Sequence, residues 1–377
     1  MSIRAVLSIM VYMVAGDFSL ASAGEIEERK DLIRAIFANW QARQAEVKTL
    51  SAAAKVNTFY PKGYLSEYRL FSMDNKKDKS IIPESDRYFA NEPCCWEIDF
   101  INQRVRKEYE LTKPWFHEDY SELALDYGLH LYANGKYRFF RPKERYPHKA
   151  KERILTPDVV LYENASHQFL LSFSDLPLLW IGGGVSGKDS LPSRMNYLEN
   201  AARFSYRGEA QWKNHNCVVL STQEQESKTA VREFWVGVEK EHPIYFCRAR
   251  DGDEVNWQIE VDYRNQGAHL IPAAWIYTEY VPLSRSFAKE TYTTQHININ
   301  AALGADLFEK KLEPGMVGYL VEKDMPVKVD RDGGFIPLEA GKARSYSLIL
   351  WGTVAFALTI GVYYVWRRVY RRRVLRS

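Results

Sequence analysis

The sequence predicts an α+β fold, in which a strongly curved antiparallel sheet is covered by helices and followed by one C-terminal transmembrane helix. Three observations carry this prediction. Aromatic residues make up 14% of the 377 residues, and aromatic side chains favour strands. Segments of alternating hydrophobicity recur through most of the chain, with short polar turns between them. One uncharged stretch, residues 346–366, is long enough to cross a bilayer.

The chain begins with the features of a secretory signal peptide. Arg4 precedes an apolar run that ends before Asp17, and an A-x-A motif stands immediately before Gly24. The apolar run is too short to span the membrane, which takes about 20 helical residues. We therefore expect residues 1–23 to be a cleaved signal peptide and residues 24–345 to form an exported domain.

The other end of the chain predicts the topology. The uncharged stretch 346–366 is followed at once by the tail 367–377, which carries six arginines. The positive-inside rule places such a tail in the cytoplasm. The sequence thus predicts a single-pass protein of the cell membrane with its body on the extracytoplasmic side. The tail is too short to fold, so we expect it to contact anionic lipid.

Within the body, the first predicted element is an amphipathic helix. Ile33, Phe37 and Trp40 follow one another at spacings of four and three, which places them on one helical face. The pattern then changes to period two. Residues 255–263 alternate apolar and polar side chains, as expected for a strand with one buried face. The Asn-Gly pair at 134–135 predicts a two-residue hairpin, because both residues tolerate positive φ.

The alternation fails between residues 174 and 203, where we expect a glycine loop with a short helix on either side. Two stretches resemble binding loops without completing them. Residues 182–189 match most of a phosphate loop, but Asp189 stands where a metal-binding hydroxyl belongs. Residues 328–339 match part of a calcium loop, but Lys328 replaces its first carboxylate. We therefore expect no cofactor and no metal site.

The remaining sequence features argue against an enzyme and against nucleic-acid binding. No histidine pair has H-x-x-x-H spacing, and no G-x-S-x-G motif supplies a nucleophile. The net charge of +3 comes from Arg4 and the arginines of the tail, and the body between them is slightly acidic. A body of this charge does not attract a polyanion. We expect no catalytic residues and no nucleic-acid partner.

Cysteine usage leaves two alternatives open. The chain has four cysteines, all in the predicted exported body: Cys94, Cys95, Cys217 and Cys247. Adjacent cysteines rarely pair because the geometry is strained, so a disulfide would join one of the first two to one of the last two. Alternatively, all four are free thiols that act as small apolar side chains. The chain has no C-x-x-C motif, which argues against zinc.

Several stretches of the body resemble the lipoprotein-carrier superfamily, typified by LolA and RseB. The first is ANWQARQAEVKTLSAAAKV at 38–56, where a helix leads into a strand, and the second is REFWVGVEKEHPIYFCRAR at 232–250, a strand hairpin. The segments 257–280 and 312–324 are similar to a bacterial branch of exported proteins in that superfamily. The resemblance implies an unclosed half-barrel whose concave apolar face binds an acyl chain.

The predicted function is therefore a non-enzymatic, membrane-tethered domain that binds an acyl chain or lipopeptide on the concave face of its sheet. The alternative is a protein-interaction or sensor domain at the membrane surface that has no lipid ligand, because its own aromatic side chains fill the hollow. The side chains that either line a cavity or fill it are those of Trp40, Trp96, Trp235, Trp257 and Trp275.

Overall fold

The structure is a computed structural model, and it describes residues 23–64, 85–116, 121–140, 158–162, 172–181, 204–223, 230–281 and 286–338. The predicted span 346–366, the tail 367–377, the glycine-loop motif 182–189 and nearly all of the signal peptide lie outside these residues. Among the helices of the described ranges, none is both long and apolar enough to cross a membrane.

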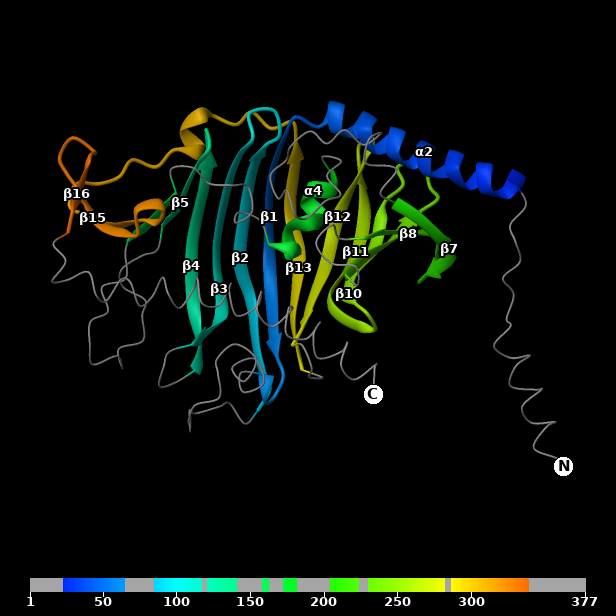
Figure 1. The fold of residues 1–377 in the computed structure, drawn as a ribbon, viewed down its shortest axis with the longest axis horizontal. Helices are drawn as coiled ribbons and strands as arrows, with labels where there is room; N and C mark the ends of the chain where they lie inside the picture. Colours follow the sequence, from blue (N-terminus) through cyan, green and yellow to red (C-terminus); the bar gives the residue numbers. More distant parts are fainter. Residues whose placement is uncertain are drawn as a thin grey trace, which may run out of the picture.

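Sixteen strands of the described residues join into a single sheet (Figure 1). The first part of the chain supplies β1 (Thr49–Tyr60), β2 (Arg87–Asp99), β3 (Arg104–Phe116), β4 (Ser121–Ala133), β5 (Lys136–Phe140) and β6 (Val159–Tyr162). The second part supplies β7 (Phe204–Trp212), β8 (His215–Gln223), β9 (Ala230–Gly237), β10 (Ile244–Asp251), β11 (Glu254–Gln266), β12 (His269–Tyr280) and β13 (Phe287–Ile299). Three short strands follow: β14 (Val317–Leu320), β15 (Met325–Val329) and β16 (Phe335–Pro337).

The order of the strands is β16-β15-β14-β6-β5-β4-β3-β2-β1-β13-β12-β11-β10-β9-β8-β7. Within β1–β6, β7–β13 and β14–β16, strands that follow one another in sequence are neighbours in the sheet. The pairings of the described strands are antiparallel except for the parallel pair β14 and β6. The run of strands β1–β6 and the run β7–β13 meet in the middle of the sheet. There β1 pairs with β2 on one side and with β13 on the other. Residues far apart in sequence, such as Val56 and Tyr292, are direct partners there. The centre of the sheet therefore gathers side chains from both halves of the chain.

Alternation of side chains explains why these segments are strands with one buried face. In β2, Cys94, Trp96 and Ile98 are buried, while Cys95 is exposed. In β11 the predicted one-sided pattern is present. The predicted hairpin at 134–135 is also confirmed: it joins β4 to β5, and its Asn and Gly have φ of 53° and 77°. Glycine tolerates this left-handed conformation without the cost that a Cβ adds.

The prediction of a helix-covered sheet is wrong. The described residues contain two α-helices, α2 (Ala23–Glu46) and the six-residue α4 (Leu176–Ile181), and no transmembrane helix among them. The predicted first helix exists as α2, but it runs along one end of the strands rather than across their face (Figure 1). Trp40 of α2 donates from Nε1 to the carbonyl of His242 at 2.9 Å, in the β9–β10 turn.

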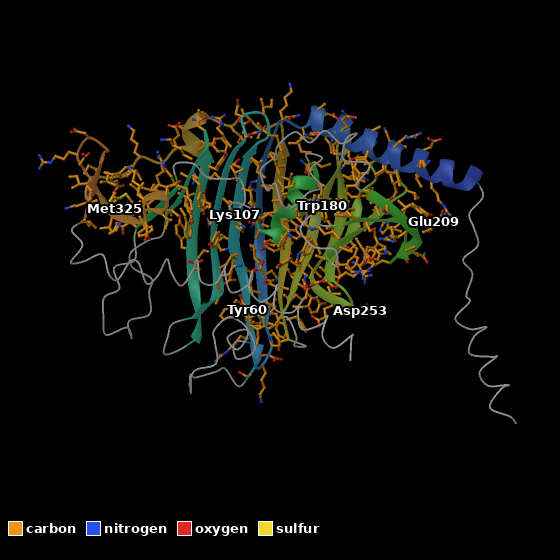
Figure 2. The ribbon with its side chains drawn as sticks, viewed as in Figure 1. Tyr60, Lys107, Trp180, Glu209, Asp253 and Met325 are labelled. Atoms are coloured by element: carbon orange, nitrogen blue, oxygen red, sulfur yellow. The ribbon has the colours of Figure 1, made fainter. Side chains whose placement is uncertain are left out.

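The main core lies on one face of the sheet, which curves around α4, and we call this the concave face (Figure 1). Buried side chains of β1, β2, β3, β9, β11, β12 and β13 belong to this cluster, together with α4 and the inner side of α2. A second, smaller core lies on the opposite face of β4, where Leu129 and Leu131 pack with Val159 and Leu320. Figure 2 shows Trp180 of α4 in front of the middle of the sheet, with Met325 toward one end.

Candidate functional site on the concave face

Three of the five predicted tryptophans lie together on the concave face. Trp96 of β2, Trp257 of β11 and Trp275 of β12 all belong to the main core. The centroids of the Trp96 and Trp275 rings are 6.0 Å apart, and Trp275 stacks on Tyr292 of β13 at 4.7 Å with an interplanar angle of 4°. Trp96, Trp275 and Tyr292 each have 1% or less of their surface exposed. The protein's own atoms therefore cover this aromatic group.

The other two predicted tryptophans lie elsewhere. Trp40 is buried in the core at the α2 end of the strands. Trp235 lies on the opposite face, because its neighbours Phe234 and Val236 point into the core, and it packs there with Trp212 and Phe246. Trp235 therefore lies apart from the other four tryptophans that the sequence proposed as cavity residues.

Residues 172–181, which we call the cover segment, lie over the aromatic group. The segment consists of Ser172, the 3-10 turn η2 (Phe173–Asp175) and α4, whose six residues are all buried. Trp275 donates from Nε1 to the carbonyl of Ser174 at 2.7 Å, and the Tyr292 hydroxyl contacts the Ser174 hydroxyl at 3.1 Å. At its exposed end Phe173 stacks on Trp257 at 4.7 Å. The cover segment thus occupies the place that the sequence assigned to a ligand.

A buried ion pair anchors the cover segment to the sheet. The Asp175 carboxylate accepts hydrogen bonds from Lys107 Nζ at 2.7 and 2.9 Å and from Trp96 Nε1 at 3.0 Å. Within the segment, it also accepts from the backbone N–H of Ser172 at 2.8 Å. The side chains of Asp175 and Lys107 are 1% and 8% exposed. A buried pair of this kind is far more costly to break on one side than to replace altogether.

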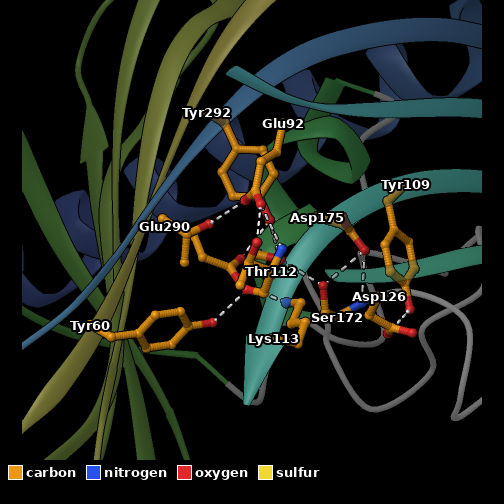
Figure 3. A network of polar contacts seen from close by, with 12 residues as sticks. Tyr60, Glu92, Tyr109, Thr112, Lys113, Asp126, Ser172, Asp175, Glu290 and Tyr292 are labelled. Carbon is orange, nitrogen blue, oxygen red and sulfur yellow. Dashed lines mark hydrogen bonds and ion pairs between the residues drawn. The ribbon is translucent and has the colours of Figure 1, made fainter. Parts of the chain in front are cut away.

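A second ion pair lies farther along the same face (Figure 3). Lys113 Nζ of β3 donates to Glu290 of β13 at 2.6 Å, and the Tyr292 hydroxyl donates to the other Glu290 oxygen at 2.6 Å. Burial alone would raise the pKa of Glu290, but the Lys113 ammonium and these hydrogen bonds hold it below its ordinary value. Burial and the charge of Glu290 raise the pKa of Tyr292. Both partners of this pair belong to the sheet itself.

Glu92 closes a gap between two strands. Strand β2 pairs with β3 over residues 94–99. Before residue 94, the Glu92 carboxylate replaces the backbone of β2 as the hydrogen-bond acceptor for β3. It accepts from the backbone N–H of Thr112 at 2.7 Å and from the Thr112 hydroxyl at 2.5 Å, and Thr58 donates to its other oxygen at 3.2 Å. This carboxylate satisfies backbone groups and is structural.

Sequence reasoning missed the polar groups of the concave face. Val105, Lys107, Tyr109, Leu111 and Lys113 alternate along β3, so both lysines stand at inward positions of a strand. A lysine at an inward position is rarely buried unless a partner neutralises it. That pattern was a usable signal for ion pairs on this face, although the partners Asp175 and Glu290 could not be read from it. The Lys107–Asp175 pair is buried, whereas the Lys113 side chain is 38% exposed.

All four cysteines are free thiols in the structure. Cys94, Cys217 and Cys247 are buried, as in the alternative of small apolar side chains, whereas Cys95 is exposed. Burial raises the pKa of Cys94 and Cys247, and it raises that of Cys217 to about 11. Three of the four thiols are thus poor nucleophiles.

The chemistry available on the concave face is that of binding. No cluster of three or more metal-ligating side chains occurs in the part of the chain that the structure describes. The face offers an apolar surface with polar donors, of which Lys107 Nζ, Trp96 Nε1, Trp275 Nε1 and the Tyr292 hydroxyl contact residues 174–175 of the cover segment. Such a surface suits a molecule with a long apolar part and a small polar end.

Comparisons with known proteins give weak likenesses. No family model matches the chain, and no curated protein does. One similar solved structure is described as an outer membrane lipoprotein-sorting protein domain from Vibrio parahaemolyticus (TM-score 0.40, 8% identity, 72% of this chain and 95% of that chain). A LolA superfamily protein from Nitrosomonas europaea has a TM-score of 0.38 at 9% identity, covering 74% of this chain and 97% of that chain. Both TM-scores are below 0.5.

Proposed function

We propose that this protein binds the acyl chain of an amphiphile on the concave face, beneath the cover segment, and that it is not an enzyme. The observation that carries the proposal is the construction of the core at this point. Among the described residues, the ten-residue cover segment lies over the aromatic group of β2, β12 and β13 and is not itself a strand of the sheet, while α2 packs on another part of the same core. The sheet can keep all its pairings while the cover segment moves.

The free energy gained by burying the apolar side chains of the cover segment is similar to that gained by burying an acyl chain. The cover segment buries five large apolar side chains, those of Leu176, Leu178, Leu179, Trp180 and Ile181. At roughly 1.5 to 3 kcal/mol for each side chain, their burial is worth roughly 7 to 15 kcal/mol. A saturated chain of about 15 methylenes gains roughly 12 kcal/mol on full burial, at about 0.8 kcal/mol each. In apolar burial alone, an acyl chain can therefore replace α4 without a large net cost.

Two details support an exchangeable cover. The Nε1 atom of Trp180 is buried without a hydrogen-bond partner among the described atoms. An unsatisfied buried donor costs about 1 to 3 kcal/mol, which α4 regains when it moves into water. Strand β1, between β2 and β13, carries the small side chains of Ala52, Ala54 and Val56 in the main core. Small side chains on the concave face leave space above the strand for the methylene groups of an acyl chain.

The alternative, an interaction domain whose hollow stays filled, is favoured by one observation. Trp96, Trp275 and Tyr292 are almost wholly buried by the protein itself, as a permanent core would require. On this alternative the cover segment never leaves the sheet, and a partner binds elsewhere.

Photo-crosslinking with an uncharged acyl probe distinguishes the two. A hexadecanol that carries a mid-chain diazirine is added to the full chain in membranes, irradiated, and mapped by peptide mass spectrometry. Acyl binding predicts cross-links in peptides of β1, β2, β12 and β13 that excess unlabelled hexadecanol competes away. A Trp235→Ala variant, altered on the opposite face, serves as the control and should label normally. Labelling confined to other segments would support the interaction domain instead.

A further inference from the structure

We propose that Lys107 and Trp96 Nε1 form a binding site for the negatively charged end of the ligand, a carboxylate or a phosphate. In the structure Asp175 occupies this site as an internal substitute. The inference deepens the proposed function and rests on it, because the same movement of the cover segment exposes the acyl surface and this site. The class of ligand is then an anionic amphiphile, not a neutral one.

The sheet supplies a fixed pair of donors. Trp96 and Lys107 are direct partners in the β2–β3 register, so their side chains project from adjacent strands on the same face. Lys107 Nζ lies 2.7 Å and Trp96 Nε1 lies 3.0 Å from oxygens of the Asp175 carboxylate. An anion that replaces this carboxylate meets donors already in place. Only the acceptor comes from the cover segment.

The charge of Lys107 makes the site selective. In the part of the chain that the structure describes, Asp175 is the carboxylate in ion-pair contact with Lys107, whose side chain is only 8% exposed. If a neutral amphiphile displaced the cover segment, it would leave the Lys107 ammonium without the carboxylate that it contacts. That loss is among the largest that a folded protein meets. An anionic amphiphile replaces the lost carboxylate and avoids it.

A third donor extends the site. Trp275 Nε1 donates to the carbonyl of Ser174, the residue next to Asp175, at 2.7 Å. Displacement of residues 174–175 therefore frees the Trp275 donor together with those of Lys107 and Trp96. A carboxylate or phosphate has enough oxygens to accept from all three. The charged end then lies beside the stacked rings of Trp275 and Tyr292, with the acyl chain over the apolar surface.

The second lysine of β3 provides a matched control. Lys113 also points to the concave face, but its partner Glu290 belongs to β13 and stays in place when the cover segment moves. Lys113 is therefore neutralised with or without a ligand. Removing its charge should not alter the preference for anionic amphiphiles.

The test compares two diazirine probes of equal chain length, palmitate and hexadecanol, on the full chain at a pH where the carboxylate is ionised. We expect wild type to label with palmitate at least about tenfold more than with hexadecanol, because a hydrogen bond to a charged group is worth that factor. Lys107→Met should lose this preference while still labelling with hexadecanol, and Lys113→Met should keep it. Asp175→Asn, which removes the competing carboxylate without changing its shape, should raise palmitate labelling.

The possible outcomes separate the inference from the proposed function. Equal labelling by both probes on the concave strands, unaffected by Lys107→Met, overturns the anion site and leaves acyl binding intact. The absence of concave labelling by either probe in wild type and in Asp175→Asn overturns both. If Lys107→Met does not fold, unchanged palmitate labelling in Asp175→Asn overturns the inference by itself. Competition by unlabelled hexadecyl phosphate against unlabelled palmitate then shows which anion is preferred.

Discussion

Lys107 occupies a position on β3 where alternation calls for an apolar side chain. Its Nζ lies 2.7 Å from the Asp175 carboxylate, and the two groups join the sheet to the cover segment. Trp96 and Trp275 complete the contact through their Nε1 atoms. These two tryptophans were predicted from the sequence. The two charged residues were not, because a partner 68 positions away in the chain leaves no mark on local patterns.

The first prediction concerns the strength of this ion pair. Lys107→Met should lower the free energy of unfolding by about 3 to 5 kcal/mol, since it leaves a buried carboxylate uncompensated. The double variant Lys107→Met/Asp175→Asn should recover most of the loss. Chemical denaturation of the single and double variants measures the coupling. Additive losses in the double variant would show that the two side chains do not interact as described.

The second prediction concerns pH. The pKa of Glu290 is held below its ordinary value of 4.5, so the folded state binds its proton less readily than the unfolded state does. Its contribution to stability is therefore present above pH 4.5 and is lost as the pH falls through the lower pKa of the folded state. Glu290→Gln should flatten this acid limb of the stability curve. Asp253→Asn, at an exposed carboxylate in the β10–β11 turn, should leave the limb unchanged.

The third prediction concerns the thiols. With native protein, a maleimide should label exposed Cys95 quickly and the buried Cys94, Cys217 and Cys247 slowly, because burial both hides them and raises their pKa. In denaturant without reductant, four thiols should react. Two reactive thiols in denaturant would instead establish a disulfide.

At the scale of elements, local patterns predicted those whose neighbours in sequence are their neighbours in space. The helix α2, the hairpin at 134–135 and the one-sided strand β11 were all readable in this way. The cover segment was only partly readable, as a short helix beside a glycine loop. Its sequence LPLLWI is apolar throughout, so no polar side marks which side of the helix is buried. Nothing in it indicates that the helix packs on the concave face of a sheet built from distant strands. The pairing of β1 with β13 is equally invisible to local patterns.

The fourth prediction concerns a substitution that weakens the packing of the cover segment but leaves the hydrogen bonds of Ser174 and Asp175 in place. Leu178→Ala removes a side chain of α4 that is 1% exposed, and it should cost about 2 to 5 kcal/mol in the free protein. It should also increase labelling of the concave strands by an acyl probe, because the competing occupant is weaker. Val238→Ala, at an exposed residue after β9, is the control for both measurements. A destabilised variant with unchanged labelling would argue that α4 is permanent core.

At the scale of the whole molecule, the sheet is an open body with two protected edges. The edge strand β16 has three residues and ends in proline, which cannot donate a ladder hydrogen bond. The opposite edge strand, β7, carries a register shift between Tyr206 and Gly208, and charged residues flank the glycine. Both devices discourage pairing with another chain.

The central claim is that an acyl ligand takes the place of the cover segment on an otherwise unchanged sheet. Hydrogen–deuterium exchange of the full chain, with and without palmitate, tests it most directly. We predict that amide exchange in residues 173–181 rises when palmitate is added, while exchange in β2, β12 and β13 stays the same or falls. Unchanged exchange in residues 173–181 at a palmitate concentration that saturates binding would contradict the claim.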